Sequence, residues 1–143
     1  MNESPMIPFS KELEHIKNYL AVEQVRFPNV KVEYDIREEQ FLLPTLTVQP
    51  LVENAVRHGI SKRQDASGRV LIRTFDTETD HVIRIEDDGI GICASAEADE
   101  KKHVGISNAR KRLAMLCAGT LSITSQPQQG TVCEIHIPKG EKK

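Results

Sequence analysis

Residues 51–59 read Leu-Val-Glu-Asn-Ala-Val-Arg-His-Gly, and residues 87–91 read Asp-Asp-Gly-Ile-Gly. The first stretch has the apolar spacing of an amphipathic helix that ends at Gly59, a residue favoured just beyond a helix terminus. The second stretch follows alternating apolar residues and is typical of a strand that enters a glycine turn. Together, and in this order, they indicate one site that is built from two distant segments.

The composition indicates one ordinary globular domain. The chain has 143 residues, of which 38% are hydrophobic and 28% charged, so it is long enough to bury its own core. The formal net charge of −2 offers no positive surface for nucleic acid, and we expect no such partner. Three cysteines without CxxC spacing predict reduced thiols in a cytosolic setting. No signal peptide or membrane-spanning apolar run is visible.

Helix and strand patterns alternate along the chain. Helical apolar spacing predicts helices at residues 10–27, 47–59 and 106–117. Alternating runs predict strands at residues 30–36, 70–75, 82–86, 121–125 and 132–137. We expect one domain over residues 9–138, a tail or linker at 1–8 and a charged tail at 139–143. This mixture predicts a two-layer α/β sandwich, in which helices cover one face of a single mixed sheet.

The helix ends are predicted from their capping residues. Thr47 would cap the second helix with its hydroxyl group. Residues 88–104 read as a mobile loop, so the third helix would run from about Ile106 to Cys117, with Gly119 marking its end. Its inward face would carry Ile106, Ala109, Leu113 and Met115 or Leu116.

The helix at residues 47–59 has two distinct faces at roughly 100° per residue. Apolar side chains share the face that must meet the core, namely Val48, Leu51, Val52, Ala55 and Val56. Asn54, Arg57 and His58 fall together on the opposite stripe. An amide oxygen, a guanidinium and an imidazole suit a metal ion paired with phosphate. The alternative is the solvated face of an ordinary amphipathic helix.

The strand before the glycine turn singles out one carboxylate. Side chains alternate along a strand, so Asp87 shares the face of Ile83 and Ile85. A carboxylate on that apolar side costs roughly several kcal/mol unless it finds donors, and the exocyclic amine of a purine is a suitable donor. Gly89 and Gly91 permit close approach of a ligand ring. The alternative is a local turn in which backbone amides satisfy Asp87.

Two later segments are candidates for the same site. Gly105 precedes the predicted start of the third helix, where free N–H groups form an anion site. Thr131 follows Gly130 at the start of the last strand and carries a hydroxyl that can reach a phosphate. The alternatives are an ordinary helix entry for the first segment and a hairpin turn for the second.

The order of these motifs resembles the ATP-binding domain of the GHKL superfamily, which has the Bergerat fold. Within it, the sequence is most similar to sensor histidine kinases of the LytS type. The supporting stretches are Glu-Leu-Glu-His-Ile-Lys-Asn-Tyr-Leu at 12–20 and Leu-Thr-Val-Gln-Pro-Leu-Val-Glu-Asn-Ala at 46–55. The resemblance extends from about Phe9 to Pro138 and implies that the chain binds Mg²⁺ and ATP.

The resemblance implies roles at the phosphate end of the pocket. Asn54 would ligate Mg²⁺, Arg57 would contact phosphate, and His58 would lie against the nucleotide. Gly105 and the following helix N-terminus would approach the phosphates. Thr131 would complete the far wall.

The resemblance also implies roles at the adenine end. Asp87 would accept a hydrogen bond from the adenine amino group, in a site shaped by Gly89 and Gly91. Residues 92–104 would form a lid over the nucleotide. At most a supporting role is implied for Glu53, His103 and Asn108.

The chain departs from the family pattern at His103, where glycine is usual. If that position needs a left-handed backbone, a non-glycine residue costs roughly 1–2 kcal/mol, or about tenfold in affinity. Another departure concerns the phosphoacceptor segment, which reads His-Phe-x-Phe-Asn in the family and does not occur here. His15 is instead predicted on a helix surface, and His81 and His136 are predicted to be structural or exposed.

We therefore expect the catalytic, ATP-binding half of a two-component sensor histidine kinase, with its acceptor histidine and dimerisation segment upstream. The expected partners are that upstream segment and a response regulator, and the expected location is the cytoplasmic part of a membrane-anchored sensor. The resemblance to the ATPases of the superfamily implies a water-activating carboxylate one helical turn before Asn54, where this chain has Pro50, which disfavours hydrolysis as the main activity. The alternatives are a nucleotide-binding signalling module without kinase activity and an anti-sigma-factor-type serine kinase.

Overall fold

The computed structural model describes residues 6–45, 47–56, 68–88, 99–126 and 130–139, and the side chains of 99–106 and 125–126 are not described. Its helices are α1 (Phe9–Arg26), α2 (Gln49–Asn54) and α3 (Asp99–Cys117). Its strands are β1 (Met6–Pro8), β2 (Val30–Ile36), β3 (Leu42–Pro44), β4 (Gly68–Asp76), β5 (Asp80–Asp87), β6 (Thr120–Gln126) and β7 (Gly130–Pro138). None of the helices described is long and apolar enough to cross a membrane.

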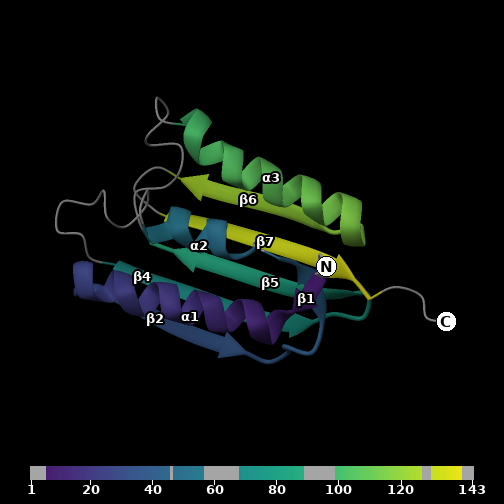
Figure 1. Ribbon diagram of the computed structural model, residues 1–143, viewed down its shortest axis with the longest axis horizontal. Helices are drawn as coiled ribbons and strands as arrows, with labels where there is room; N and C mark the ends of the chain where they lie inside the picture. Colours follow the sequence, from purple (N-terminus) through teal and green to yellow (C-terminus); the bar gives the residue numbers. More distant parts are fainter. Residues whose placement is uncertain (1–5, 46, 57–67, 89–98, 127–129, 140–143) are drawn as a thin grey trace, which may run out of the picture.

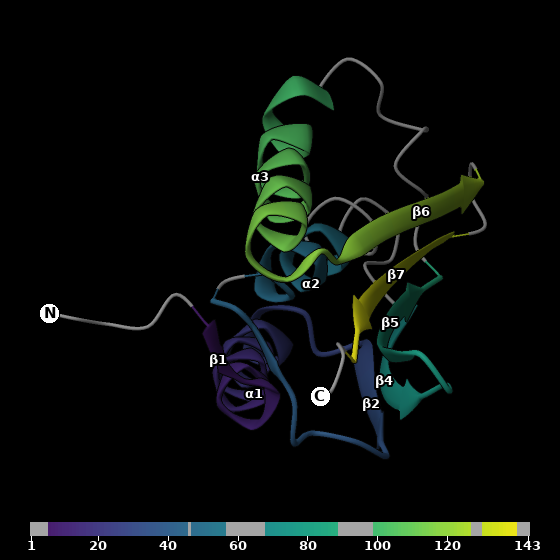
Figure 2. The same cartoon turned by 90° about the vertical axis from the view of Figure 1, so that its right-hand side faces the viewer.

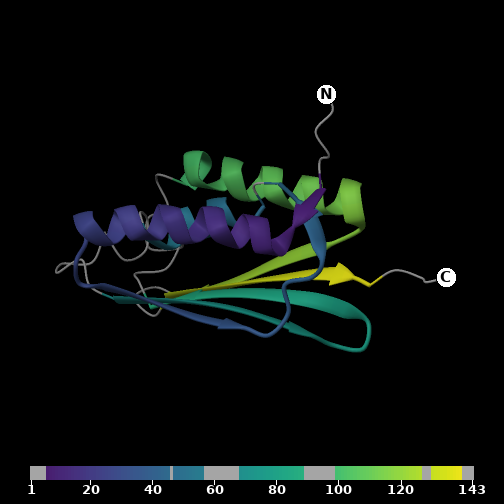
Figure 3. The same ribbon diagram turned by 60° about the horizontal axis from the view of Figure 1, so that its bottom comes forward.

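The main sheet has five strands in the order β2-β4-β5-β7-β6. The β2–β4 pair is parallel and the other neighbours are antiparallel, so the sheet is mixed. The helices of the described residues all lie on one face of this sheet, with α2 between α1 and α3, and the described part of the chain places no helix on the opposite face (Figures 2 and 3). The predicted two-layer sandwich is confirmed.

The core lies between the helices and the inner face of the sheet. Ile16 and Leu20 of α1 and Ile83 and Ile85 of β5 are at most 1% exposed. The predicted core face of the second helix is also buried, at Val48, Leu51, Val52, Ala55 and Val56. Apolar spacing in the sequence therefore predicted the inward faces of both layers, because burial of apolar area is the dominant stabilising term.

The first residues of the chain differ from the prediction. Met6–Pro8, which were expected to be tail or linker, form β1 and pair in antiparallel fashion with β3. Neither short strand has an alternating pattern long enough to be recognised from the sequence. Their pairing places the start of α1 next to Phe41, whose carbonyl oxygen accepts a hydrogen bond from the Phe9 N–H at 2.8 Å.

The third helix begins earlier than predicted. It begins at Asp99 rather than Ile106, because the acidic Asp99 and Glu100 suit a helix N-terminus and the lysines that follow are good helix formers. Its inner face carries Ala109 and Leu113, as predicted, but the prediction is wrong for Met115 and Leu116, which are 80% and 40% exposed.

The end of α3 also differs from the expectation. Gly119 does follow the helix, but the left-handed residue is Ala118, with φ of 58°. The Gly119 N–H donates to the Leu113 carbonyl oxygen at 2.9 Å, which satisfies a carbonyl of the last helical turns.

Alternating charges cross the helix-free face of the sheet. Along four strands the side chains form a charge ladder in the order Asp35, Arg73, Glu86, Arg84, Glu134, His136 and Asp80. The His136 ring lies between two carboxylates, with Nε2 at 3.0 Å from Glu134 and Nδ1 at 3.2 Å from Asp80. These two partners, Glu134 first, raise the pKa of His136 above its ordinary value of 6.5.

We expect the charge ladder to make stability depend on pH. Because the pKa of His136 is higher in the folded chain, its contribution is fully present below pH 6.5 and is lost as the pH rises through the folded pKa. The ring is 35% exposed, so the loss should not exceed about 1 kcal/mol. Urea denaturation between pH 5.5 and 9 would measure this loss, as the difference in unfolding free energy between the parent and His136→Gln at each pH.

The exposed His15 of α1 supplies the control for this pH series. The variant His15→Gln should leave the pH profile of the unfolding free energy unchanged. A parent profile parallel to that of His136→Gln would contradict the prediction.

Candidate functional site

The candidate site lies at the end of the sheet where β5 ends and β7 begins. Asp87 is the last residue of β5 and stands in register with Val70 on one side and Thr131 on the other. Val70 and Thr131 are buried and Asp87 is half-buried, on the inner face of the sheet. The predicted orientation of Asp87, on the side of Ile83 and Ile85, is confirmed.

The charge of Asp87 reaches Cys133 on the neighbouring strand. Burial is the main reason that the pKa of the Cys133 thiol rises to about 12, and the nearby carboxylate of Asp87 raises it further. Arg110 of α3 has the opposite effect. Asp87 therefore places negative charge on the inner face beside Thr131, where a ligand with hydrogen-bond donors would be favoured.

Gly130 lies against the backbone of Asp87. Its φ is +99°, and a Cβ at this position would overlap the carbonyl oxygen of Asp87 and lie 2.8 Å from the Cα of Asp88. Only glycine meets both conditions, because it lacks a Cβ and tolerates positive φ. The close approach keeps Thr131, the next residue, beside Asp87.

Helix α2 lies over the same end of the sheet, on the inner face (Figure 1). Asn54 is its last residue and is half-buried, whereas the neighbouring Glu53 accepts a hydrogen bond from the Gln49 side chain at 3.1 Å. Thr47 does not cap the helix as predicted, since its hydroxyl donates to the Pro44 carbonyl oxygen at 2.6 Å.

The cap of α2 comes from α1. Oε2 of Glu12, which is fully buried, accepts hydrogen bonds from the backbone N–H groups of Thr47, Val48 and Gln49 at 3.1, 3.0 and 3.2 Å. These groups would otherwise be unpaired at the start of a helix. A negative charge there also suits the helix dipole. Glu12 thus sets the position of the helix that carries Asn54.

Sequence reasoning missed the role of Glu12, although one signal was present. Glu12 belongs to the buried stripe of α1 together with Leu13, Ile16 and Leu20. A carboxylate on an apolar stripe needs a partner, so this position is the signal from which a buried contact could have been predicted. The sequence did not indicate which backbone groups would provide it.

Other predicted residues are placed differently or lie outside the described part of the chain. Gly105 and His103 lie within α3, not before it, so the free N–H groups expected at Gly105 are not found in this helix, and the backbone of His103 is helical rather than left-handed. Asn108 is exposed on α3. Outside the described residues lie Arg57, His58, Gly89 and Gly91.

A hollow of about 310 Å³ touches the same strand ends but opens on the helix-free face. Leu71, Glu86 and Val132, which line it, alternate with the inward-facing residues of their strands. Asp87, Gly130 and Thr131 also line this hollow, so it adjoins the candidate site.

A family described as "Histidine kinase-, DNA gyrase B-, and HSP90-like ATPase" matches residues 42–141 of the chain. The matched region includes Asn54, Asp87 and Thr131, the three described residues on which the candidate site rests.

The chain is similar to curated proteins over nearly its whole length. The uncharacterized protein YwpD of Bacillus subtilis is 38% identical over 98% of this chain and 53% of its own length. Sensor protein LytS of the same organism is 31% identical over 96% of this chain and 26% of its own length. The chain therefore spans about half of the first relative and about a quarter of the second.

A solved structure shares the fold. The histidine kinase domain of a blue-light activated histidine kinase from Erythrobacter litoralis has a TM-score of 0.70 at 22% identity. The match covers 96% of this chain and 65% of that domain. This similarity extends to α1 and β2, which precede the region matched by the family.

Proposed function

Since this chain belongs to the histidine kinase-, DNA gyrase B- and HSP90-like ATPase family, we propose that it is the catalytic domain of a LytS-type sensor histidine kinase. It binds ATP with Mg²⁺ and presents the γ-phosphate to a phosphoacceptor histidine outside this chain. The proposal rests above all on Asp87, a carboxylate at the inner-face end of β5, in one cross-strand row with Thr131. Such a group has the chemistry to accept from a purine amine.

The adenine end of the proposed site centres on Asp87. Its carboxylate accepts a hydrogen bond from the adenine amino group, and Thr131 lines the pocket beside it. We assign Gly89 and Gly91 to the surrounding turn, where the absence of side chains leaves room for the ring.

The phosphate end of the proposed site centres on Asn54. Its half-buried amide is a neutral oxygen ligand of the kind that Mg²⁺ accepts, with phosphates and waters completing the coordination. Arg57 contacts phosphate, and His58 lies against the nucleotide. Gly105 joins them only if the first turns of α3 leave the helical conformation when nucleotide binds, because interior helix N–H groups are already bonded.

The proposed reaction is phosphoryl transfer rather than hydrolysis. Transfer of this kind depends on positioning and on neutralising phosphate charge, which Mg²⁺ supplies when it is bound. Pro50 occupies the position, one turn before Asn54, at which a water-activating carboxylate would stand. In the full-length protein, the phosphate acceptor is an upstream histidine, a response regulator receives the group, and a membrane anchor lies outside this chain.

Calorimetric titration of the chain with Mg²⁺·ATP and Mg²⁺·ADP tests the proposal. We expect both nucleotides to bind, and Asp87→Asn to weaken both by about 10–100-fold, since it removes a charge-assisted hydrogen bond. The parent should bind nucleotide more tightly with Mg²⁺ than with EDTA present, and Asn54→Ala should reduce this difference in affinity. Absence of binding to the parent chain would overturn the proposed function.

Asp88 provides a matched control for Asp87. It is exposed, and its Oδ1 accepts a hydrogen bond from the Arg69 N–H at 2.8 Å, which an asparagine can also do. Asp88→Asn should therefore leave nucleotide affinity within about twofold of the parent. Equal losses at positions 87 and 88 would refute the assignment of Asp87. Phosphate transfer to a purified acceptor segment, supplied in trans, would then test the kinase activity.

A further inference from the structure

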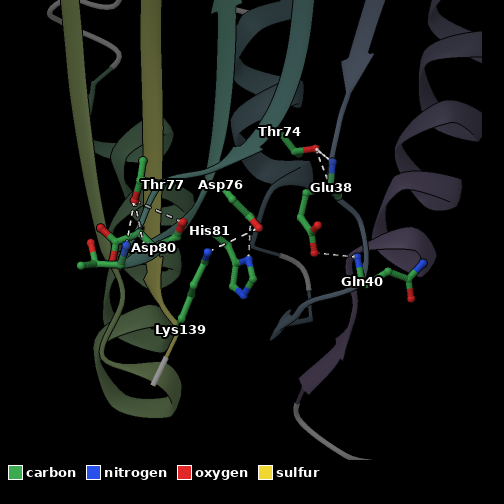
Figure 4. Close-up of polar contacts among 9 residues, drawn as sticks. Glu38, Gln40, Thr74, Asp76, Thr77, Asp80, His81 and Lys139 are labelled. Carbon is green, nitrogen blue, oxygen red and sulfur yellow. Dashed lines mark hydrogen bonds and ion pairs between the residues drawn. The ribbon is translucent and has the colours of Figure 1, made fainter. Parts of the chain in front are cut away.

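A cluster of metal-ligating side chains lies at the opposite end of the sheet from Asp87. Glu38, Asp76 and His81 each place one ligand atom within 4.8 Å of the others (Figure 4). Glu38 follows β2, Asp76 ends β4 and His81 lies near the start of β5. Three segments of the chain thus bring one nitrogen and two carboxylate groups together.

The backbone of Glu38 is held in place by Thr74, which is 1% exposed. The Thr74 hydroxyl donates to the Glu38 carbonyl oxygen at 2.6 Å and accepts from the Glu38 N–H at 3.2 Å. The neighbouring Arg37 N–H donates to the Thr74 carbonyl oxygen at 3.1 Å. These bonds keep the backbone of Glu38 beside Thr74, which precedes Asp76 by two residues on β4, so little ordering of this backbone remains to be done when a ligand binds.

The imidazole of His81 is held on two sides. Asp76 and His81 are direct partners in the β4–β5 register, and Nδ1 of the ring lies 3.0 Å from Oδ1 of Asp76. The ring stacks on Phe41 with centroids 4.8 Å apart and planes 9° from parallel. Phe41 stacks in turn on the buried Phe9. The orientation of the ring is therefore fixed by packing.

We propose that Glu38, Asp76 and His81 form a site for a divalent transition metal ion of the Zn²⁺ class. An imidazole with two carboxylates is a donor set that such ions favour, and three protein ligands leave room for water in the remaining positions. Lys139 is the only cationic group that an ion pair in the described part of the chain places at this cluster, with Nζ 3.6 Å from Asp76. Metal binding displaces it.

The site is independent of the proposed nucleotide pocket. His81 and Asp87 are six residues apart on β5, which corresponds to roughly 20 Å along a strand. None of the three ligands belongs to the residues assigned to ATP. Failure of metal binding would therefore leave the nucleotide proposal intact, and the reverse also holds.

Titration of the chelator-treated chain with ZnCl₂, followed by calorimetry, tests the proposal. We expect one ion to bind, and Glu38→Gln, Asp76→Asn and His81→Gln each to weaken binding by at least about tenfold. Titration with Co²⁺ should give absorption bands without thiolate charge transfer, which excludes the cysteines as ligands. The proposal would be overturned if the parent chain did not bind Zn²⁺ at about 1 mM. It would also be overturned if all three variants bound Zn²⁺ with the affinity of the parent.

Two further variants sharpen the test. His136 also lies between two carboxylates, on the other face of the sheet, and His136→Gln should leave the Zn²⁺ affinity unchanged. Lys139→Gln should strengthen Zn²⁺ binding by a few fold, because it removes the competing cation from Asp76. If His81→Gln unfolds the chain, the other two variants still test the site, because Asp76→Asn should weaken Zn²⁺ binding whereas Lys139→Gln should strengthen it.

Discussion

The variant Glu12→Ala is expected to lower the free energy of unfolding by about 3–5 kcal/mol, because it leaves buried backbone donors without an acceptor. The N–H groups of Thr47, Val48 and Gln49 all donate to the carboxylate of Glu12. Helix α2 has only six residues, so it has few hydrogen bonds of its own to retain its position. Urea denaturation followed by circular dichroism would measure the loss.

Two variants on the same helix calibrate this result. Glu12→Gln retains one acceptor oxygen but not the charge, and should cost about 1–2 kcal/mol. Glu14 is exposed on α1, and Glu14→Ala should change stability by no more than about 0.5 kcal/mol. If the alanine variants at positions 12 and 14 were equally stable, the capping role of Glu12 would be refuted.

The other large effect is expected at Gly130. Gly130→Ala should cost at least about 3 kcal/mol, since positive φ is unfavourable for alanine and a Cβ would overlap the backbone of Asp87. The backbone of Asp87 is paired with β4 on one side and β7 on the other, so it cannot move aside as a flexible side chain can. We therefore expect the end of β5 to shift, and nucleotide affinity to fall together with stability.

Gly119 serves as the comparison for Gly130. A Cβ at Gly119 would lie 3.1 Å from the His136 carbonyl oxygen and from Leu113 Cδ2, and its backbone does not need positive φ. Gly119→Ala should cost only about 1 kcal/mol and leave nucleotide affinity unchanged. A Gly130→Ala variant as stable as Gly119→Ala would show that β5 and β7 can separate at this point without cost.

Local patterns predicted much of the fold and part of the site. The bounds of β2 and the inward side of Asp87 follow from the two-residue period of a strand, which needs only neighbouring residues. The buried face of α2 follows in the same way from helical spacing.

What the sequence did not predict depends on contacts between distant residues. The cap of α2 is supplied by Glu12, more than thirty positions earlier in the chain. The strand Met6–Pro8 forms only because Leu42–Pro44 lies beside it. The early start of α3 was not predicted because Gly105, which has a low helix propensity, suggested a loop before it, whereas the helix continues through this glycine.

The bond between Glu12 and α2 also has a mechanical consequence. The carboxylate of Glu12, on α1, is hydrogen-bonded to three backbone N–H groups at the start of α2. Helix α1 therefore cannot slide or turn relative to α2 without breaking these bonds. Glu12 lies in the first turn of α1, only a few residues from the N-terminal strand β1. A force on the chain before α1 would therefore act on the helix that carries Asn54 through these hydrogen bonds, without involving the five-stranded sheet.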